Sequence, residues 1–575
     1  MIDTLLRRAA LALVLAGTLA SCGGGDPAPE LRTTQFGAVE GLALSSDVFA
    51  WKGIPFAKAP TGALRWRAPV DPDPWTAPRL AKDFAPACVQ YGRIYGPGAN
   101  NRYDETIGTT LGQSVGSEDC LAMNIWSRGR AGRKLPVIVF FHGGSNVSGY
   151  TADPMYDGAA LAGTGEAVVV TVNFRLGIFG FLNLPQLRTG TDSANDSGNF
   201  ALLDSIKALQ FINRNIDAFG GDPGNVTIMG ESAGAINVYA LLTSPLMTSA
   251  NPKLFHRAIP LSGGISLASN LPPGSVPLLN PAPVALAQGN ALLNNLLIAD
   301  GKATDAASAQ AFAATQTSAQ IADYLRGKSS SALFTTLLTK LSLVGLAGSG
   351  PIPDGAVVAT DPIGAINAGN YVKVPVLAGN TRDEGKLFPS FLFLAGGSGN
   401  ARVPTDAALF ANHFNYKPDA APQTTLEQWI APSYLPVDAP VTGFTARAET
   451  LNKIFFLASR DNVLNALKAQ QPNVWYYRFD WDEQPAPWNQ IYGAAHVFDL
   501  PFVFGNFGPS LFSNVMNTAA NRTGRFDLSY AMMRSVGAFA RNGDPNDVVL
   551  GVSWPTWPKK LLFDATPTAG KISVE

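Results

Sequence analysis

The chain has 575 residues, a length that suggests several domains unless one large α/β fold accounts for it. Hydrophobic residues make up 46% and charged residues 15%, which excludes intrinsic disorder and a polytopic membrane protein. The 42 basic and 43 acidic residues give a net charge of -1, so we expect no nucleic-acid partner. Three cysteines are too few for a disulfide scaffold or a cysteine-rich zinc site, and their odd number calls for an explanation.

Residues 1–21 are typical of a signal peptide. Arg7 and Arg8 precede an apolar stretch, residues 9–20, that is too short to span a bilayer as a helix. The stretch ends in Leu-Ala-Ser-Cys, which resembles the lipobox of bacterial lipoproteins and implies cleavage before Cys22 and lipidation of that cysteine. We therefore expect export from a bacterial cell and a lipid anchor in the membrane, facing the periplasm or the cell surface. The alternative is a plain secretory signal and a secreted protein.

Residues 22–30 predict a tether that is flexible in its glycines and stiffer where the prolines begin. Residues 31–575 contain no long charge run, no repeat of fixed period and no linker that marks a second boundary. We therefore expect one large catalytic domain with insertions over residues 31–575.

Short apolar runs bounded by turn residues predict buried strands. The runs are residues 135–141, 167–172, 226–229 and 372–377. Because their apolarity is continuous, we expect a mostly parallel sheet that is covered by helices on both faces, and a helical pattern over residues 200–219 fits this α/β architecture. Residues 265–349 carry little strand signal and predict a mostly helical insertion, either a cap over a site or a structural excursion.

The pattern G-x-S-x-G occurs twice. The copy around Ser114 lies in a polar stretch with no strand before it, which predicts a surface loop. The copy around Ser232 follows the strand-like residues 226–229 and opens a helix-like run. A strand, a sharp turn and a helix are the context of a nucleophile elbow, in which flanking glycines permit the turn and the helix N-terminus favours a developing oxyanion.

A serine nucleophile needs an adjacent base, usually a histidine held by a carboxylate. In the order nucleophile, acid, histidine, the base lies well after Ser232. His142 precedes it, His256 follows too closely and is expected on a helix surface, and His413 lies in a helix-like stretch. His496 lies in a loop of small residues beyond a strand-like run, where a catalytic histidine is expected.

Two carboxylates are candidates for the acid. The strand-like residues 372–377 run into a polar turn that contains Asp383 and Glu384. The residue pattern leaves both open.

An ordered series of motifs resembles the type-B carboxylesterase family, which includes cholinesterases, liver-type carboxylesterases and bacterial para-nitrobenzyl esterase. The motifs cover nearly all of the mature chain, and they are Lys52-Gly-Ile-Pro-Phe-Ala57, Ser117-Glu-Asp-Cys-Leu121, His142-Gly-Gly144, Asn173-Phe-Arg-Leu-Gly177, Phe219-Gly-Gly-Asp-Pro223, the turn at Ser232, Asp383-Glu-Gly385 and Gly493-Ala-Ala-His496.

The resemblance implies an α/β-hydrolase fold and a triad of Ser232, Glu384 and His496. It also implies a disulfide between Cys88 and Cys120, which suits an oxidising compartment. The resemblance also places Glu231 and Ser262 in a buried network behind the histidine, and we expect them to be supporting residues.

The oxyanion loop departs from the commonest family pattern. Ser145 stands where many relatives have a third glycine, and the resemblance implies an oxyanion hole made by the N–H groups of Gly144, Ser145 and Ala233. Asp499 stands where many relatives have glutamate, from which we conclude nothing.

The implied activity is two-step hydrolysis of a small-molecule carboxylic ester, with no metal or organic cofactor required. A non-catalytic cell-surface binding module of the same fold is an alternative, disfavoured because each triad position is filled. Hydrolysis of amides, carbamates or polyesters by the same machinery stays open.

Overall fold

The computed structural model describes residues 30–575 except 46, 129–130, 415–416 and 418. The signal segment, Cys22 and all of the tether but Glu30 therefore lie outside the described residues. The strands of the main sheet are β3 (Leu42–Ala43), β4 (Phe49–Pro55), β8 (Ala122–Ser127), β9 (Leu135–Phe141), β10 (Val168–Val172), β11 (Gly221–Glu231), β12 (Arg257–Leu261), β13 (Val376–Thr381), β14 (Val474–Phe479), β15 (Leu561–Ala565) and β16 (Gly570–Val574). Two small sheets contain β1 (Leu31–Thr34), β2 (Gly37–Glu40), β5 (Arg79–Leu80), β6 (Gln90–Tyr91) and β7 (Ser114–Val115).

The α-helices connect and cover these strands. They are α2 (Ile107–Thr110), α3 (Ala159–Gly165), α4 (Gly177–Gly180), α5 (Phe200–Asn215), α6 (Ala233–Leu242), α7 (Pro245–Thr248), α8 (Ala282–Ala299), α9 (Ala306–Ala314), α10 (Ser318–Arg326), α11 (Ser330–Thr336), α12 (Pro362–Asn367), α13 (Asp406–Phe414), α14 (Leu426–Trp429), α15 (Phe444–Leu451), α16 (Ala458–Gln470), α17 (Trp488–Ile491), α18 (Leu500–Phe504), α19 (Ser513–Met516) and α20 (Arg522–Asn542). No helix of the described residues is long and apolar enough to cross a bilayer.

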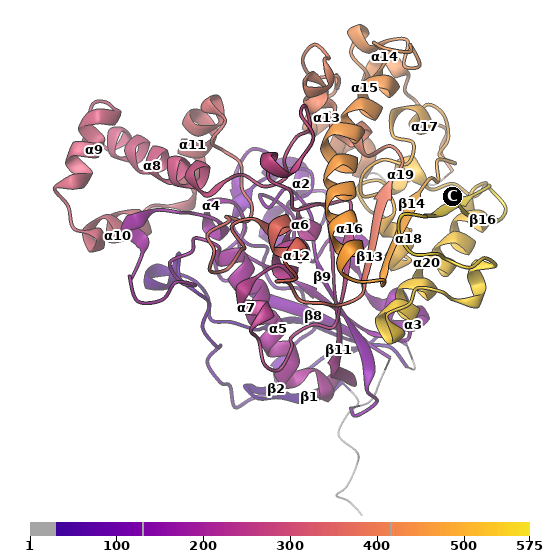
Figure 1. Cartoon of the computed structure of the whole chain (residues 1–575), viewed down its shortest axis with the longest axis horizontal. Coiled ribbons are helices and arrows are strands. Elements are labelled where there is room, and N and C mark those ends of the chain that lie inside the picture. The colour runs from indigo at the N-terminus through magenta and orange to yellow at the C-terminus, as the bar shows by residue number, and fades with distance from the viewer. Residues whose placement is uncertain (1–29, 46, 129–130, 415–416, 418) are drawn as a thin grey trace, which may run out of the picture.

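The main sheet has eleven strands in the order β16-β15-β14-β13-β12-β11-β9-β10-β8-β4-β3 (Figure 1). All neighbours from β15 to β10 pair in parallel. On either side of this parallel block the pairs are antiparallel: β15 with β16 at one edge, and β10 with β8, β8 with β4 and β4 with β3 toward the other. The expected mostly parallel sheet is confirmed.

Two cores explain the continuous apolar runs, because side chains alternate between the faces of a strand. In β9, Val137, Val139 and Phe141 belong to one core, whereas Ile138 and Phe140 belong to the other. Helices α5, α6 and α16 contribute to the first core, and α3, α18 and α20 contribute to the second. Both faces of the sheet are therefore covered, as expected.

One predicted strand is displaced along the chain. The sequence predicts a strand over residues 372–377, but β13 begins at Val376 and continues to Thr381. Pro375 has no N–H to donate to a ladder, although its carbonyl oxygen accepts a hydrogen bond from the N–H of Ala258 at 3.1 Å. The shift brings the end of the strand to within three residues of Glu384.

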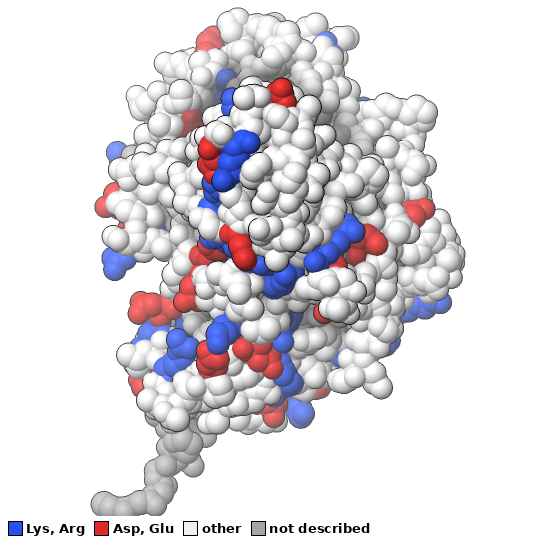
Figure 2. Space-filling view, turned by 90° about the vertical axis from the view of Figure 1, so that its left-hand side faces the viewer, with Lys and Arg blue, Asp and Glu red and all other residues white. Residues whose placement is uncertain are grey.

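The expected helix over residues 200–219 is α5 followed by a 3₁₀ turn, Ile216–Phe219. The expected insertion over residues 265–349 is mostly helical, as predicted, and forms α8 to α11. In Figure 1 these helices project to the left, away from the main sheet. Figure 2 looks onto this side of the molecule, where basic and acidic side chains are intermingled on a largely uncharged surface.

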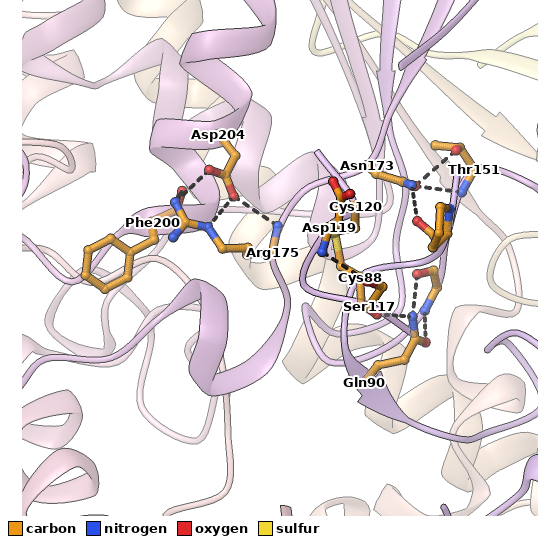
Figure 3. Close-up of a disulfide and its surroundings, with 12 residues drawn as sticks. Cys88, Gln90, Ser117, Asp119, Cys120, Thr151, Asn173, Arg175, Phe200 and Asp204 are labelled. Carbon is orange, nitrogen blue, oxygen red and sulfur yellow. Dashed lines mark hydrogen bonds and ion pairs between the residues drawn. A yellow bond between two sulfur atoms is a disulfide. The ribbon is translucent and has the colours of Figure 1, made fainter. Parts of the chain in front are cut away.

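Cys88 and Cys120 form a disulfide, as the resemblance implies (Figure 3). Next to it, the side-chain amide of Gln90 donates to the carbonyl oxygens of Cys88 and Gly149, both at 3.0 Å, and its oxygen accepts from the N–H of Gly149 at 2.9 Å. Gly149 belongs to the loop that follows β9. The bridged segment is therefore fastened to that loop.

Removing the bridge should lower the melting temperature of the protein. Because Cys88 and Cys120 are separated by 32 positions, closing the loop is worth roughly 3 to 4 kcal/mol in the chain-entropy account. We expect the double variant C88S/C120S to melt below the wild type and at the same temperature as reduced wild type, as measured by circular dichroism. Equal melting of the oxidised wild type and the variant would contradict this expectation.

Candidate active site

A cavity of about 660 Å³ opens beyond the carboxyl ends of the parallel strands. Strand β9 lies between β10 and β11, so the chain leaves it toward one side and returns on the other. Such a switch point leaves a crevice in which α/β proteins bind ligands. Gly144 and Ser145 after β9, Ser232 after β11 and His496 after β14 all line this cavity.

Ser232 lies in a sharp turn between β11 and α6. Its backbone has φ 57° and ψ -121°, a combination that non-glycine residues rarely adopt. A Cβ at Gly230 would lie 2.3 Å from the carbonyl oxygen of Gly234, and a Cβ at Gly234 would lie 2.0 Å from that of Phe141. Only glycine permits these approaches, so the two flanking glycines allow the turn that presents Ser232 to the cavity.

His496 is held by two carboxylates. Its Nδ1 donates a hydrogen bond to Oε2 of Glu384, and its Nε2 lies 3.0 Å from Oε1 of Glu231 as an ion-pair contact. All three side chains are buried. No hydrogen bond joins Ser232 to His496 in the described residues, and such catalytic hydrogen bonds are often long in a free enzyme and tighten with substrate.

Glu384 is fixed by donors from β13 and from the residue that follows β12. Its Oε1 accepts from Oγ of Ser262 at 2.7 Å, from Nδ2 of Asn380 at 2.8 Å and from the N–H of Thr381 at 2.9 Å. Burial alone would raise the pKa of Glu384, but the charge of His496 and these hydrogen bonds hold it below its usual value. Sequence reasoning named Ser262 and missed Asn380 and Thr381, because an amide and a main-chain N–H carry no motif.

Among the described residues, Asp383 forms no hydrogen bond or ion pair with His496, and it has a different task. It forms an ion pair with Arg382 at 2.9 Å and accepts a hydrogen bond from the N–H of Ala494 at 3.0 Å. The N–H of Asp383 donates in turn to the carbonyl oxygen of Ala494 at 2.9 Å. Of the two carboxylates that the residue pattern leaves open, Glu384 is the one that contacts His496, while Asp383 fastens the loop that carries His496.

The buried charges shift each other's protonation. Burial would lower the pKa of His496, but the carboxylates of Glu231 and Glu384 raise it to about 10. Burial raises the pKa of Glu231 and raises that of Asp499 to about 7. Asp499 accepts a hydrogen bond from the Tyr477 hydroxyl at 2.7 Å. Burial therefore makes Glu231 and Asp499 easier to protonate than an exposed carboxyl group.

The loop after β9 brings free N–H groups to the cavity. Within the described residues, the N–H groups of Gly144, Ser145 and Ala233 donate to no protein acceptor. Gly144 has φ 96° and Ser145 has φ 56°, and the left-handed conformation costs a non-glycine residue about 1 to 2 kcal/mol. A Cβ at Gly143 would lie 2.5 Å from Oε2 of Glu231, so this position also requires glycine.

The remaining candidates lie elsewhere. Ser114 lies half-buried in β7 and donates to Oγ of Ser330 at 3.0 Å, so the expectation of a surface loop is wrong. His256 lies just before β12, where its Nδ1 accepts from the N–H of Val226 at 3.1 Å, not on a helix surface. His413 is in α13, as expected, but buried, and His142 is buried against Phe174.

The cap over the cavity is not the helical insertion, because no residue of 265–349 lines the cavity. The insertion therefore does not cover the site, and of the two alternatives the structural excursion is correct.

The wall of the cavity is formed in part by Phe388 and Phe391, and the ring centre of Phe388 lies 5.0 Å from that of His496. Asp153, whose pKa burial raises to about 6, and Arg402 line it too. The sequence carries no motif for these residues.

Among the described residues, no group of three or more histidine, cysteine, aspartate or glutamate side chains is arranged to hold a metal ion.

Comparisons with known proteins agree with this geometry. Residues 28–567 match the profile of the carboxylesterase family. The para-nitrobenzyl esterase of Bacillus subtilis (strain 168) is 31% identical over 544 residues, 94% of this chain and 96% of that protein. The fumonisin B1 esterase of Sphingopyxis macrogoltabida is 33% identical over 539 residues, 92% of this chain and 85% of that protein. A solved carboxylesterase of Geobacillus stearothermophilus is 30% identical with a TM-score of 0.68, covering 95% of this chain and 98% of that one.

The chain therefore belongs to the carboxylesterase family and has the α/β-hydrolase fold. It is a carboxylic ester hydrolase. The esterase relatives favour an enzyme over a non-catalytic binding module of the same fold.

Proposed function

We propose that this enzyme hydrolyses esters through an acyl-enzyme intermediate on Ser232, with His496 as the general base and Glu384 as its carboxylate partner. The observation that carries the proposal is the turn at Ser232, whose strained backbone presents a serine to the cavity that His496 also lines. A strained backbone conformation persists only where the surrounding structure enforces it, and such conformations are concentrated at active sites.

In the first step, Oγ of Ser232 attacks the ester carbonyl while Nε2 of His496 takes its proton. The carbonyl oxygen becomes an oxyanion, which accepts hydrogen bonds from the N–H groups of Gly144, Ser145 and Ala233. His496 then protonates the leaving alcohol, and the acyl group stays on Ser232. In the second step, His496 deprotonates a water molecule that attacks the acyl-enzyme and releases the acid.

Glu384 stabilises the imidazolium that forms in each step. Its hydrogen bonds from Ser262, Asn380 and Thr381 keep it ionised and leave Oε2 for His496. A fixed carboxylate costs little reorganisation when the charge develops. Glu231 supports the same histidine from the Nε2 side.

Replacing the nucleophile should abolish activity without unfolding the protein. We expect S232A to lose labelling by a fluorophosphonate probe and release of p-nitrophenol from short acyl esters. The matched control is S114A, which changes the serine of the other G-x-S-x-G copy and should retain both signals. Persistent labelling of S232A would overturn the assignment.

Replacing Glu231 should shift the pH dependence of catalysis. Because the Glu231 carboxylate raises the pKa of His496, E231Q should lower that pKa and let the base form persist at lower pH. We therefore expect the acidic limb of the kcat/KM profile to move to lower pH. The control is D406N, because the Asp406 carboxylate lines the same cavity but is paired with Arg402 at 2.5 Å. An unmoved or upward-shifted limb in E231Q would contradict this account.

The proposal extends to the location of the enzyme. Support comes from the lipobox-like residues that end in Cys22, and the disulfide between Cys88 and Cys120 suits an oxidising compartment. Lipidation of Cys22 would anchor the enzyme, since two or more acyl chains bind a bilayer stably.

Removing the acylated cysteine should release the enzyme from membranes. We expect the C22A full chain, expressed in a bacterial cell, to leave the membrane fraction and to lose incorporation of labelled palmitate. The control S21A keeps a small residue before the cleavage point and should stay in the membrane fraction. Unchanged membrane retention of C22A would count against the anchor.

A further inference from the structure

The loop that follows β9 contains consecutive residues in the left-handed region. Gly144 has φ 96°, and Ser145 and Asn146 both have φ 56°. Within the loop, the N–H groups of Val147 and Ser148 donate to the carbonyl oxygen of Gly144 at 3.0 and 3.1 Å. These local hydrogen bonds close the loop on itself, but they do not connect it to the turn at Ser232. Something else must hold the loop at a fixed distance from the nucleophile.

A buried amide pair makes that connection. Nδ2 of Asn237 donates to Oδ1 of Asn146 at 2.9 Å, and Nδ2 of Asn146 faces Oδ1 of Asn237 at 3.4 Å. Their exposed fractions are 0% and 1% respectively. If one side chain were removed, the amide of the other would be buried without a hydrogen-bond partner. The pair therefore strongly favours the arrangement in which both amides meet.

The pair joins the two parts of the proposed oxyanion hole. Asn237 lies in α6 four residues after Ala233, so both lie on the same side of the helix. Asn146 directly follows Ser145 in the loop. The amide pair therefore links the element that carries the N–H of Ala233 to the element that carries the N–H groups of Gly144 and Ser145.

We propose that Asn146 and Asn237 are positioning residues that hold the oxyanion loop in register with the nucleophile helix. This inference rests on the proposed function, because the relative position of those N–H groups matters only if they bind an oxyanion together. The carbonyl oxygen of Asn146 also accepts from the N–H of Gly177 at 2.6 Å, which anchors the far side of the loop. Without the amide pair, Ser145 and Asn146 are free to relax toward negative φ, which turns the Ser145 N–H away from the oxyanion.

The test compares N237A with the wild type in hydrolysis of p-nitrophenyl butyrate. We expect kcat to fall about 10- to 100-fold with KM nearly unchanged, because a displaced oxyanion donor acts on the transition state. Inhibition by an alkyl trifluoromethyl ketone, whose adduct with serine carries an oxyanion, should weaken by a similar factor. The acidic limb of the pH profile should not move, because neither asparagine titrates.

Two further variants separate positioning from stability. Asn215 is also buried, and it accepts from the N–H of Gln35 at 2.7 Å at the far end of α5. N215A should lower the melting temperature yet keep the wild-type kcat and inhibition. N146G removes the same amide pair from the other side and removes the left-handed strain at that residue. We expect N146G/N237A to lose no more activity than N237A, because both changes break one interaction.

A wild-type kcat and ketone inhibition in folded N237A would overturn the inference, and so would independent, multiplying losses in the double variant. Failure of the proposed function has a different signature, since the wild type itself would then show no labelling that depends on Ser232.

Discussion

The whole site depends on the parallel register of β9, β11, β12 and β13. Gly230 pairs with Phe141, Glu231 pairs with Leu261, and Leu261 pairs with Gly379. Parallel strands in this register end at one edge, so the residues that follow them meet there. Side chains from distant parts of the chain come together for this reason, and no local feature of any one loop would place them.

The same register buries a concentration of charge that the protein must manage. One imidazole, His496, lies among Glu231, Glu384 and Asp499, and an unpaired buried carboxylate is costly. Only Glu384 receives three hydrogen bonds on one oxygen, and only its pKa is lowered among these acids. The hydrogen bonds therefore favour the ionised form of Glu384, the partner of the histidine. Within the described residues, Glu231 and Asp499 lack such a set of donors, and burial makes them easier to protonate.

Much of the fold was predictable, because buried parallel strands leave continuous apolar runs such as 135–141. The predictions from the sequence were wrong or left open where backbone chemistry or tertiary contacts outweighed the pattern of apolar residues. The apolar run 372–377 suggests a strand that begins before Pro375, but β13 begins only after this proline and continues through a glycine and polar residues. The helical insertion was predicted as helical, but whether it covers a site depends on where it packs, and the cavity is lined by other segments.

The sequence by itself determined the serine turn at Ser232, because glycines at 230 and 234 between a strand and a helix have a local signature. Chain order also predicted His496 as the base, and the family resemblance predicted Glu384 as the acid. Only the tertiary structure assigned Asp383 to the loop of the histidine, joined Asn146 to Asn237 and built the cavity wall. Those contacts join residues far apart in the chain through ordinary amides, backbone groups and aromatic rings, and their positions follow from packing rather than from any pattern of residue types.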